Sequence, residues 1–284
     1  MVASKERTVD VGPISMGSGK SVFVIAEIGI NHDGSMEKAM ELILRSKEAG
    51  ASAGKLQTYI TEKRTSKDSP IFDILKRCEL SFSQQEQLFA YAREIDLPLF
   101  STPFDDESVE FLHSVAAPCF KIASFDVVNT ALLEKVVKFG KPVILSRGMC
   151  TENELDNAVS ILDGGCVPYA LMHCVSAYPV NNHSDCNLNT IRGLMDRYPV
   201  PIGFSDHTIG GNIAELAVAA GASLIEKHVT ISRQSDGADH AISMEFDELQ
   251  VMISRLNYVT EALGSIVRGP LKVEAPIMQF RRLT

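Results

Sequence analysis

The sequence predicts an α/β fold, a (β/α)8 TIM barrel, from three observations. The chain of 284 residues has about the length of one barrel domain. Segments with helical periodicity separate its apolar runs, and such strand–helix alternation favours a parallel sheet. Polar side chains at the ends of all the runs suit a closed ring better than an open sheet, which gathers its site at one switch point. Eight runs show this pattern: Val22–Gly29, Ser52–Tyr59, Pro98–Phe104, Cys119–Ser124, Pro142–Met149, Tyr169–Ser176, Pro201–Thr208 and Leu224–Thr230.

Each intervening segment carries a helix signal. Ser35 can cap a helix that begins at residue 36, just before an apolar stripe. Ser83 with Glu86, and Thr151 with Glu154, match capping boxes where helices should begin. Further helices are expected over residues 107–116, 130–139, 188–197, 212–220 and 246–263.

The N-terminal segment precedes the first barrel strand. Residues 1–20 are expected to form a short hairpin that turns at Gly17–Gly19 and caps the barrel bottom, and residues 21–284 are expected to form the barrel domain. Gly19-Lys20-Ser21 imitates the end of a phosphate-binding loop. Because Ile14 stands where the first glycine is needed, and because the stretch precedes a strand, we reject that interpretation.

Composition restricts the class of protein. The net charge is −9 and there is no dense run of Lys and Arg, so neither a nucleic acid nor an acidic membrane is expected as a partner. No apolar stretch approaches the ~20 residues of a membrane helix, and the N-terminus lacks the apolar core of a signal peptide. The six cysteines form no CxxC pair. Together these features predict a cytoplasmic protein with reduced thiols.

Two histidines suggest a metal site. His207 and His228 lie at the ends of the seventh and eighth runs, which are neighbours in a closed barrel, and Glu27 ends the first run beside them. Two imidazoles with a carboxylate suit Mn²⁺ or Mg²⁺. The alternative is that each histidine is a satisfied core residue, and for His173 structural packing explains its position at least as well.

Two lysines interrupt otherwise apolar runs. Lys55 and Lys121 need an anionic partner, because an unpaired buried charge is costly. Hydroxyls at neighbouring run ends complete a cradle for a small polyanion that carries phosphate and carboxylate: Thr102, Ser124, Ser146 and Ser205. Two alternatives stay open, namely lysines that reach outward to water and a lysine that forms a Schiff base.

At this point the chain resembles the N-acetylneuraminate (sialic acid) synthases with their legionaminate, pseudaminate and spore-coat relatives. The resemblance spans roughly residues 5–282 and rests on nine motifs in the same order: IAEIGINHDGS (25–35), GKLQTY (54–59), STPFD (101–105), FKIASFD (120–126), ILSRGM (144–149), LMHCVSAYP (171–179), GFSDHT (203–208), EKHVT (226–230) and DHAISM (239–244). It implies a barrel enzyme that condenses phosphoenolpyruvate with the open-chain aldehyde of an N-acylated mannosamine-type sugar. The products are a nine-carbon 2-keto acid and phosphate.

The resemblance also implies roles for individual residues. His207 and His228 match the metal ligands of the family. The motif positions that match contacts to phosphoenolpyruvate are Lys55, Thr102, Lys121, Ser124, Ser146, Ser176 and Ser205. The positions that match groups around the sugar and the reacting centre are Glu27, Gln57, Asp126, Tyr178 and Asp239. A cation held by the histidines would polarise the aldehyde, and Glu27 would direct water to carbon two.

Three departures from the family pattern concern the sugar. The family usually continues into a small antifreeze-like domain, which supplies an arginine to the partner subunit of a swapped dimer, whereas this chain ends at Thr284. The loop before Cys78 lacks an asparagine-bearing insertion, Arg147 replaces a small residue and Ser176 replaces an asparagine. We therefore expect a rim arginine, Arg147 or Arg233, to contact the sugar. We also expect a homo-oligomer, with a separate antifreeze-like domain protein as a further possible partner.

Two other functions remain open from the sequence. A related phosphoenolpyruvate-condensing enzyme could take another aldose, as the 3-deoxy-octulosonate-8-phosphate synthases do, although a phosphosugar would require extra Arg or Lys at the rim. A barrel that binds a ligand or partner without turnover is the other possibility. The retained Lys121, His207 and His228 argue against it, because an idle site has no use for buried charges.

Overall fold

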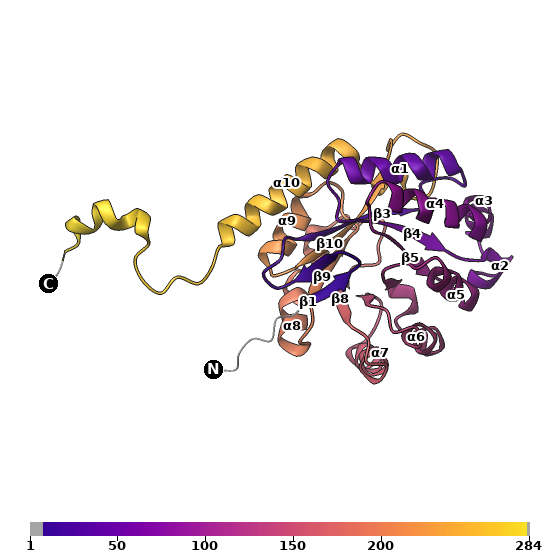
Figure 1. The fold of residues 1–284 in the computed structure, drawn as a ribbon, viewed down its shortest axis with the longest axis horizontal. Coiled ribbons are helices and arrows are strands. Elements are labelled where there is room, and N and C mark those ends of the chain that lie inside the picture. Colours follow the sequence, from indigo (N-terminus) through magenta and orange to yellow (C-terminus); the bar gives the residue numbers. More distant parts are fainter. Residues whose placement is uncertain (1–7, 283–284) are drawn as a thin grey trace.

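Eight parallel strands close into a barrel, as the sequence predicts (Figure 1). The computed structural model describes residues 8–282. Strand β10 pairs with both β9 and β3, so that Leu224 faces Gly203 on one side and Phe23 on the other. The barrel strands are β3 (Phe23–Gly29), β4 (Ala53–Thr58), β5 (Leu99–Pro103), β6 (Phe120–Ile122), β7 (Val143–Arg147), β8 (Tyr169–Cys174), β9 (Ile202–Asp206) and β10 (Leu224–Thr230), with the short β11 (Met244–Glu245) beside β10.

Helices alternate with these strands and surround the barrel (Figure 1). They are α1 (Met36–Glu48), α2 (Thr61–Arg64), α3 (Phe72–Cys78), α4 (Phe82–Glu94), α5 (Asp106–Ser114), α6 (Thr130–Val137), α7 (Glu152–Gly164), α8 (Asn189–Arg197), α9 (Asn212–Ala219) and α10 (Phe246–Leu263). The described residues also include four 3-10 helices: η1 (Ser124–Asp126), η2 (His183–Cys186), η3 (His240–Ile242) and η4 (Lys272–Phe280).

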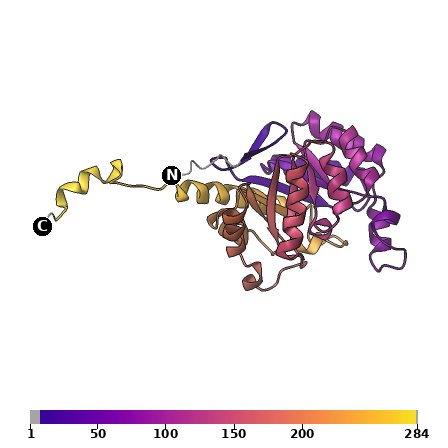
Figure 2. The same ribbon diagram turned by 90° about the horizontal axis from the view of Figure 1, so that it is seen from below.

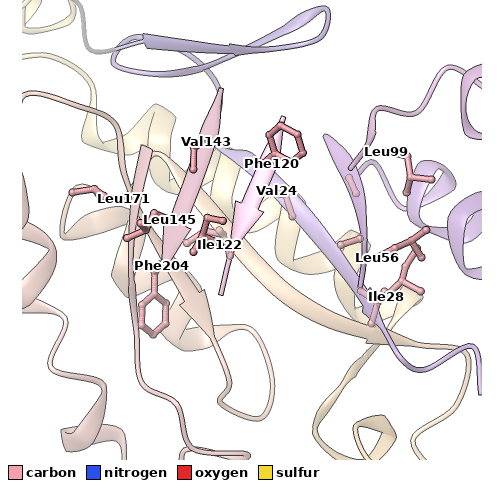
Figure 3. Packing of buried hydrophobic residues seen from close by; sticks show 14 of the residues in the cluster. Val24, Ile28, Leu56, Leu99, Phe120, Ile122, Val143, Leu145, Leu171 and Phe204 are labelled. Carbon is pink, nitrogen blue, oxygen red and sulfur yellow. The ribbon is translucent and has the colours of Figure 1, made fainter. Parts of the chain in front are cut away.

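The outward and inward side chains of each strand pack in different places. Outward side chains such as Val24, Leu56 and Leu145 pack in the large core beneath the helices (Figure 3). Inward side chains near the strand starts, among them Ile25 and Phe100, form a separate apolar cluster in the barrel. Because side chains alternate along a strand, the residue two positions further on points into the same interior. The inward face therefore changes from an apolar layer to the polar strand ends.

The N-terminal hairpin consists of β1 (Thr8–Val11) and β2 (Ile14–Gly17), which pair antiparallel. Its Val9, Val11 and Met16 belong to the same cluster as the inward residues at the strand starts. The expectation of a hairpin at the barrel bottom is thus confirmed. The predicted turn is wrong: the chain turns at Gly12-Pro13, where Gly12 has φ 59°, rather than at Gly17–Gly19.

The helix caps follow the sequence with one exception. Ser35 caps α1, and Thr151 with Glu154 forms the predicted capping box of α7. The box predicted from Ser83 is wrong, because α4 begins two residues earlier than that box implies and takes its cap from Ser81, whose partner is Gln84. A serine does cap this helix, as predicted, but Ser81 and Ser83 stand two residues apart and either could act as the cap.

Two segments lie outside the regular alternation. Helices α2 and α3, together with the chain that joins them, occupy residues 61–78 between β4 and α4; we call this segment the α2–α3 arch. After α10, the chain extends away from the barrel and carries η4 (Figures 1 and 2). No helix in residues 8–282 is both long enough and apolar enough to cross a membrane.

Candidate active site

One pocket lies at the carboxyl ends of the strands and gathers most of the predicted site residues. Its lining includes residues from every barrel strand or from the loop that follows it. The predicted residues that it brings together are Glu27, Lys55, Gln57, Thr102, Lys121, Ser124, Ser146, Tyr178, Ser205, His207, His228 and Asp239. The inward alternation explains this convergence, since Lys55 stands two residues after the buried Ala53 and Ser146 two after the buried Ile144.

Both predicted lysines are buried and point into the pocket. Lys55 Nζ lies 2.9 Å from Glu27 Oε2 and 2.9 Å from Glu226 Oε2. Lys121 Nζ donates to Ser146 Oγ at 2.7 Å and lies 3.8 Å from Glu226 Oε1. The alternative in which these side chains reach outward to water is therefore wrong. Burial forces such charges to find partners inside the barrel.

The sequence analysis missed Glu226 as a site residue. Its carboxylate lies between the two lysines and also accepts a hydrogen bond from Ser205 Oγ at 2.9 Å. The alternation of side chains along β10 could have revealed it, because Glu226 stands two residues before His228 and therefore lies on the same face of the strand. An anionic substrate held by the lysines would have to share them with this carboxylate.

The buried charges have perturbed proton affinities. Burial raises the pKa of Glu27 to about 7, with Lys55 opposing the shift. Burial lowers the pKa of Lys121 to about 8, with Glu226 opposing it. Burial would also lower the pKa of Lys55, but Glu226 and Glu27 more than offset that effect and hold the pKa above its usual range. Of the two lysines, Lys55 is therefore a permanent cation, whereas Lys121 loses its charge as the pH rises through about 8.

His207 and His228 stand side by side, with ring centroids 5.5 Å apart. His207 Nδ1 lies 2.9 Å from the carbonyl of Val175, which can only accept, so Nδ1 carries a proton and Nε2 is the nitrogen that could bind a metal. His228 is buried, its Nδ1 has no hydrogen-bond partner, and burial lowers its pKa. A neutral imidazole is the form that binds a metal, and burial favours this form for His228.

These residues fit a metal site that is only partly supplied by the protein. Within residues 8–282, no group of three or more His, Cys, Asp or Glu side chains is placed to hold an ion. Asp239 Oδ2 lies 3.7 Å from His228 Nδ1, which is beyond hydrogen-bond distance. A metal held by His207 and His228 keeps further coordination positions for substrate or water oxygens, as catalytic metal sites do.

Three predicted residues do not line the pocket. Ser176 lies just behind it, with its Oγ 2.8 Å from Ser124 Oγ. Asp126 follows Ser124 on η1 and accepts a hydrogen bond from Asn129. Arg147 lies elsewhere, in a separate cavity with Glu152 and Tyr198.

The expectation that Arg147 or Arg233 reaches over the barrel mouth is wrong. Because Ser146 points inward, its neighbour Arg147 must point outward, where Nη2 donates to the carbonyl of Cys150 at 3.4 Å. Arg233 donates through both Nη atoms to Glu248 at 2.8 Å and lines no part of the pocket. His173 also points outward, beside Arg147, and binds the carbonyl of Cys186 at 2.7 Å, which makes it structural.

A different arginine enters the pocket. Arg64 is the last residue of α2 and donates through Nη1 to Gln57 Oε1 at 2.9 Å. It lines the pocket together with Ile71 and Ile74 of the α2–α3 arch. No periodic pattern in residues 60–71 singles out Arg64, so the sequence analysis had no local signal for it.

The fold and the pocket define a (β/α)8-barrel enzyme whose reacting groups lie at the carboxyl ends of its strands. The chain belongs to the NeuB family, whose model matches residues 42–268. This family consists of synthases, which are transferases that condense phosphoenolpyruvate with a sugar, and the chain is an enzyme of this type.

Individual proteins extend the likeness over nearly the whole chain. The chain is 40% identical to an uncharacterized protein of Methanocaldococcus jannaschii, over 95% of this chain and 80% of that protein. It is 33% identical to the N,N'-diacetyllegionaminic acid synthase of Legionella pneumophila, over 94% of this chain and 80% of that enzyme. The crystal structure of the N-acetylneuraminic acid synthetase of Leptospira borgpetersenii, in complex with citrate, superposes with a TM-score of 0.94 at 36% identity, covering 97% of this chain and 96% of that one.

Proposed function

We propose that this enzyme condenses phosphoenolpyruvate with the open-chain aldehyde of an N-acylated mannosamine-type aldose, giving a nine-carbon 2-keto sugar acid and phosphate. The observation that carries the proposal is the placement of the two buried lysines beside two adjacent imidazoles in one pocket. The lysines suit the anionic substrate, and the imidazoles suit a cation that polarises the aldehyde.

Phosphoenolpyruvate is held by Lys55 and Lys121 at the centre of the barrel. Hydroxyl groups around the two ammonium groups take the remaining phosphate and carboxylate oxygens, and these groups belong to Thr102, Ser124, Ser146 and Ser205. Ser176 supports this set through Ser124. Charge-assisted hydrogen bonds of this kind are stronger than neutral ones and orient the substrate.

The aldose occupies the outer part of the pocket, near Gln57, Tyr178 and Asp239. The ring centroids of Tyr178 and His207 lie 4.1 Å apart, so the two rings are in contact and Tyr178 stands beside the imidazole end of the pocket. His207 and His228 would hold Mn²⁺ or Mg²⁺, and the ion, when bound, supplies Lewis-acid polarisation of a carbonyl oxygen. The Asp239 carboxylate lies 3.7 Å from His228 Nδ1 and adds negative charge beside the cation.

The reaction needs one carbon–carbon bond and one water. Carbon three of phosphoenolpyruvate attacks the aldehyde carbon, whose oxygen becomes the hydroxyl of the product after it gains a proton. Water adds to carbon two, and Glu27 takes the proton that the water releases. The new hydroxyl on carbon two then gives its proton to the departing phosphate as the bond between carbon two and the phosphate oxygen breaks, which leaves the keto group and free phosphate. Lys55 touches Glu27 and can stabilise its carboxylate during this step.

The test is phosphate release from phosphoenolpyruvate by the purified enzyme, with Mn²⁺, against a panel of aldoses. We expect release with N-acetylmannosamine or a related N-acyl aldose, and none with arabinose 5-phosphate. Release with the phosphosugar alone would assign the enzyme to the other class of condensing synthases. Binding of phosphoenolpyruvate without turnover of any aldose would indicate a barrel that no longer catalyses.

Replacement of both His207 and His228 by alanine is expected to weaken Mn²⁺ binding at least about tenfold, because losing even one supporting group of a metal site costs that much. Electron paramagnetic resonance of free Mn²⁺ measures this without reference to activity. The matched control is His113→Ala, since His113 packs on Phe139 outside the pocket. Unchanged Mn²⁺ affinity in the double variant would remove the metal from these two rings.

A further inference from the structure

Arg64 is held in a fixed place at the mouth of the pocket. Its guanidinium carbon lies 3.7 Å from the centre of the Phe104 ring and 4.6 Å from that of Tyr59. Its Nη1 donates to Gln57 Oε1 at 2.9 Å. A cation stacked on aromatic faces and tied to an amide is positioned before any ligand arrives.

The donors of Arg64 are largely unused. A guanidinium has five N–H groups, and one of these is engaged by Gln57. Within residues 8–282 no carboxylate lies within ion-pairing distance of it, and Asp126, Asp239 and Glu27 act on it only from further away. The remaining donors are therefore available to acceptor oxygens of a ligand that fills the pocket.

The charge of the pocket favours a neutral acceptor sugar. Its lining holds as many cations as carboxylates: Lys55, Arg64 and Lys121 against Glu27, Glu226 and Asp239. A divalent metal and the anionic phosphoenolpyruvate roughly offset one another on top of this balance. A phosphorylated aldose would add about −1.5 to −2 further charges, for which the described lining offers no additional cation. The sugar oxygen that accepts a hydrogen bond from Arg64 should therefore belong to an uncharged group.

An apolar wall stands beside the guanidinium. Ile71, Ile74 and Leu75 of the α2–α3 arch line the pocket next to Phe104. Ile74 and Phe104 pack on a small buried cluster that includes Tyr59 and Leu75, so the wall is anchored rather than loose. An acyl group matches this surface, because it offers a carbonyl oxygen to the arginine and an alkyl chain to the isoleucines.

The position along the sugar agrees with an acyl group next to the reacting carbon. A Cβ built on Gly29 would lie 3.1 Å from Glu27 Oε1, 3.4 Å from Gln57 Nε2 and 3.6 Å from His228 Cε1, so these three side chains meet at one point. Gln57 therefore bridges the imidazole end of the pocket and Arg64. If the aldehyde of the sugar lies at His228, the substituent on its second carbon lies beyond Gln57, on the side of Arg64.

We propose that Arg64 and the apolar wall of the α2–α3 arch form an acyl subsite, which selects aldoses that carry an N-acyl group on the carbon next to the aldehyde. The inference rests on the proposed function and adds to it the group by which the acceptor is chosen. Arg64 donates to the acyl carbonyl, and Ile71 and Ile74 contact the alkyl chain.

The test compares N-acetylmannosamine with mannose, which bears a hydroxyl at the same carbon. Arg64→Gln is expected to lower the ratio of kcat/KM for N-acetylmannosamine over mannose about tenfold or more, with the KM for phosphoenolpyruvate changed less than about twofold. Arg77→Gln is the matched control, because Arg77 is exposed on the same arch and does not line the pocket. Thermal unfolding of both variants checks that they fold.

A second variant tests the wall independently. Ile71 is 48% exposed, so Ile71→Ser should fold normally. It is expected to reduce the preference for N-butanoylmannosamine over N-acetylmannosamine while leaving the KM for phosphoenolpyruvate unchanged. An unchanged preference would remove Ile71 from the alkyl contact.

The results of these experiments distinguish failure of the acyl subsite from failure of the proposed reaction. If the wild-type enzyme releases phosphate with neither sugar, the proposed function fails and the subsite fails with it. If the wild type is active but Arg64→Gln slows both sugars by the same factor, Arg64 acts through Gln57 on the reacting end and the acyl subsite is wrong. Wild-type activity without preference for the acylated sugar would also overturn it.

Discussion

Replacement of Lys121 by methionine is expected to weaken phosphoenolpyruvate binding about tenfold to a hundredfold, since a hydrogen bond to a charged group contributes about 1.5–3 kcal/mol. Lys121 is 1% exposed and its Nζ contacts Ser146 at 2.7 Å, so water cannot replace the lost ammonium group. Methionine fills a similar volume, which limits the change to the charge. Calorimetric titration with phosphoenolpyruvate gives the dissociation constant.

The same variant carries a pH signature. Burial lowers the pKa of Lys121 to about 8, so the group is charged below that pH and loses its proton as the pH rises through it. Phosphoenolpyruvate affinity of the wild type should therefore be full below pH 8 and fall above it. In Lys121→Met this step should vanish. Lys138→Met is the control for net charge, because Lys138 is exposed on the outside of the barrel. Equal affinity and an equal pH profile in wild type and Lys121→Met would exclude Lys121 from the substrate site.

Replacement of Lys227 by methionine is expected to lower the free energy of unfolding by about 3–5 kcal/mol, because removing one partner of a buried ion pair leaves the other charge uncompensated. Lys227 Nζ lies 2.9 Å from Asp206 Oδ2, and the two side chains are 1% and 0% exposed. Asp206 Oδ1 in turn accepts from the amide of Thr208 at 2.8 Å and from its hydroxyl at 2.7 Å. The pair thus fastens β9 to β10 directly behind the two histidines.

Urea unfolding measures the effect, and two further variants interpret it. Arg255→Met is the matched control: it breaks the exposed pair with Glu215, for which about 0–1 kcal/mol is expected. The double variant Asp206→Asn with Lys227→Met should lose less than the sum of the single variants, because no unpaired charge remains. A loss below about 1 kcal/mol for Lys227→Met alone would show that the remaining carboxylate finds other compensation.

The residues of the pocket differ in how far the sequence reveals them. Lys121, His207 and His228 stand in or directly after apolar runs, so the sequence indicates the strand to which each belongs. Their shared inward direction follows from the alternation of side chains along a strand. The same rule could have placed Glu226, which lies two residues before His228, and could have excluded Arg147, which follows the inward Ser146. For both residues, the alternation of side chains along the strand was readable from the sequence.

Arg64 is different in kind. Residues 60–71 follow neither a period of two nor a helical period, and nothing in them indicates which side chain turns toward the barrel axis. Its direction depends on the rings of Tyr59 and Phe104, which come from the ends of two different strands, and on the amide of Gln57. Contacts among three chain segments cannot be inferred from the order of residues within one of them.

The sequence by itself determined the closed barrel, the hairpin beneath it and the strand ends that carry charge, because alternation and capping act over a few residues and are written locally. The tertiary structure alone decided which charges meet: it placed Glu226 between Lys55 and Lys121, and Arg64 above Gln57. Ring closure brings β10 beside β3, although nearly two hundred residues separate Glu27 from Glu226 in the chain. Electrostatic partnership depends on distance in space, and the barrel sets that distance.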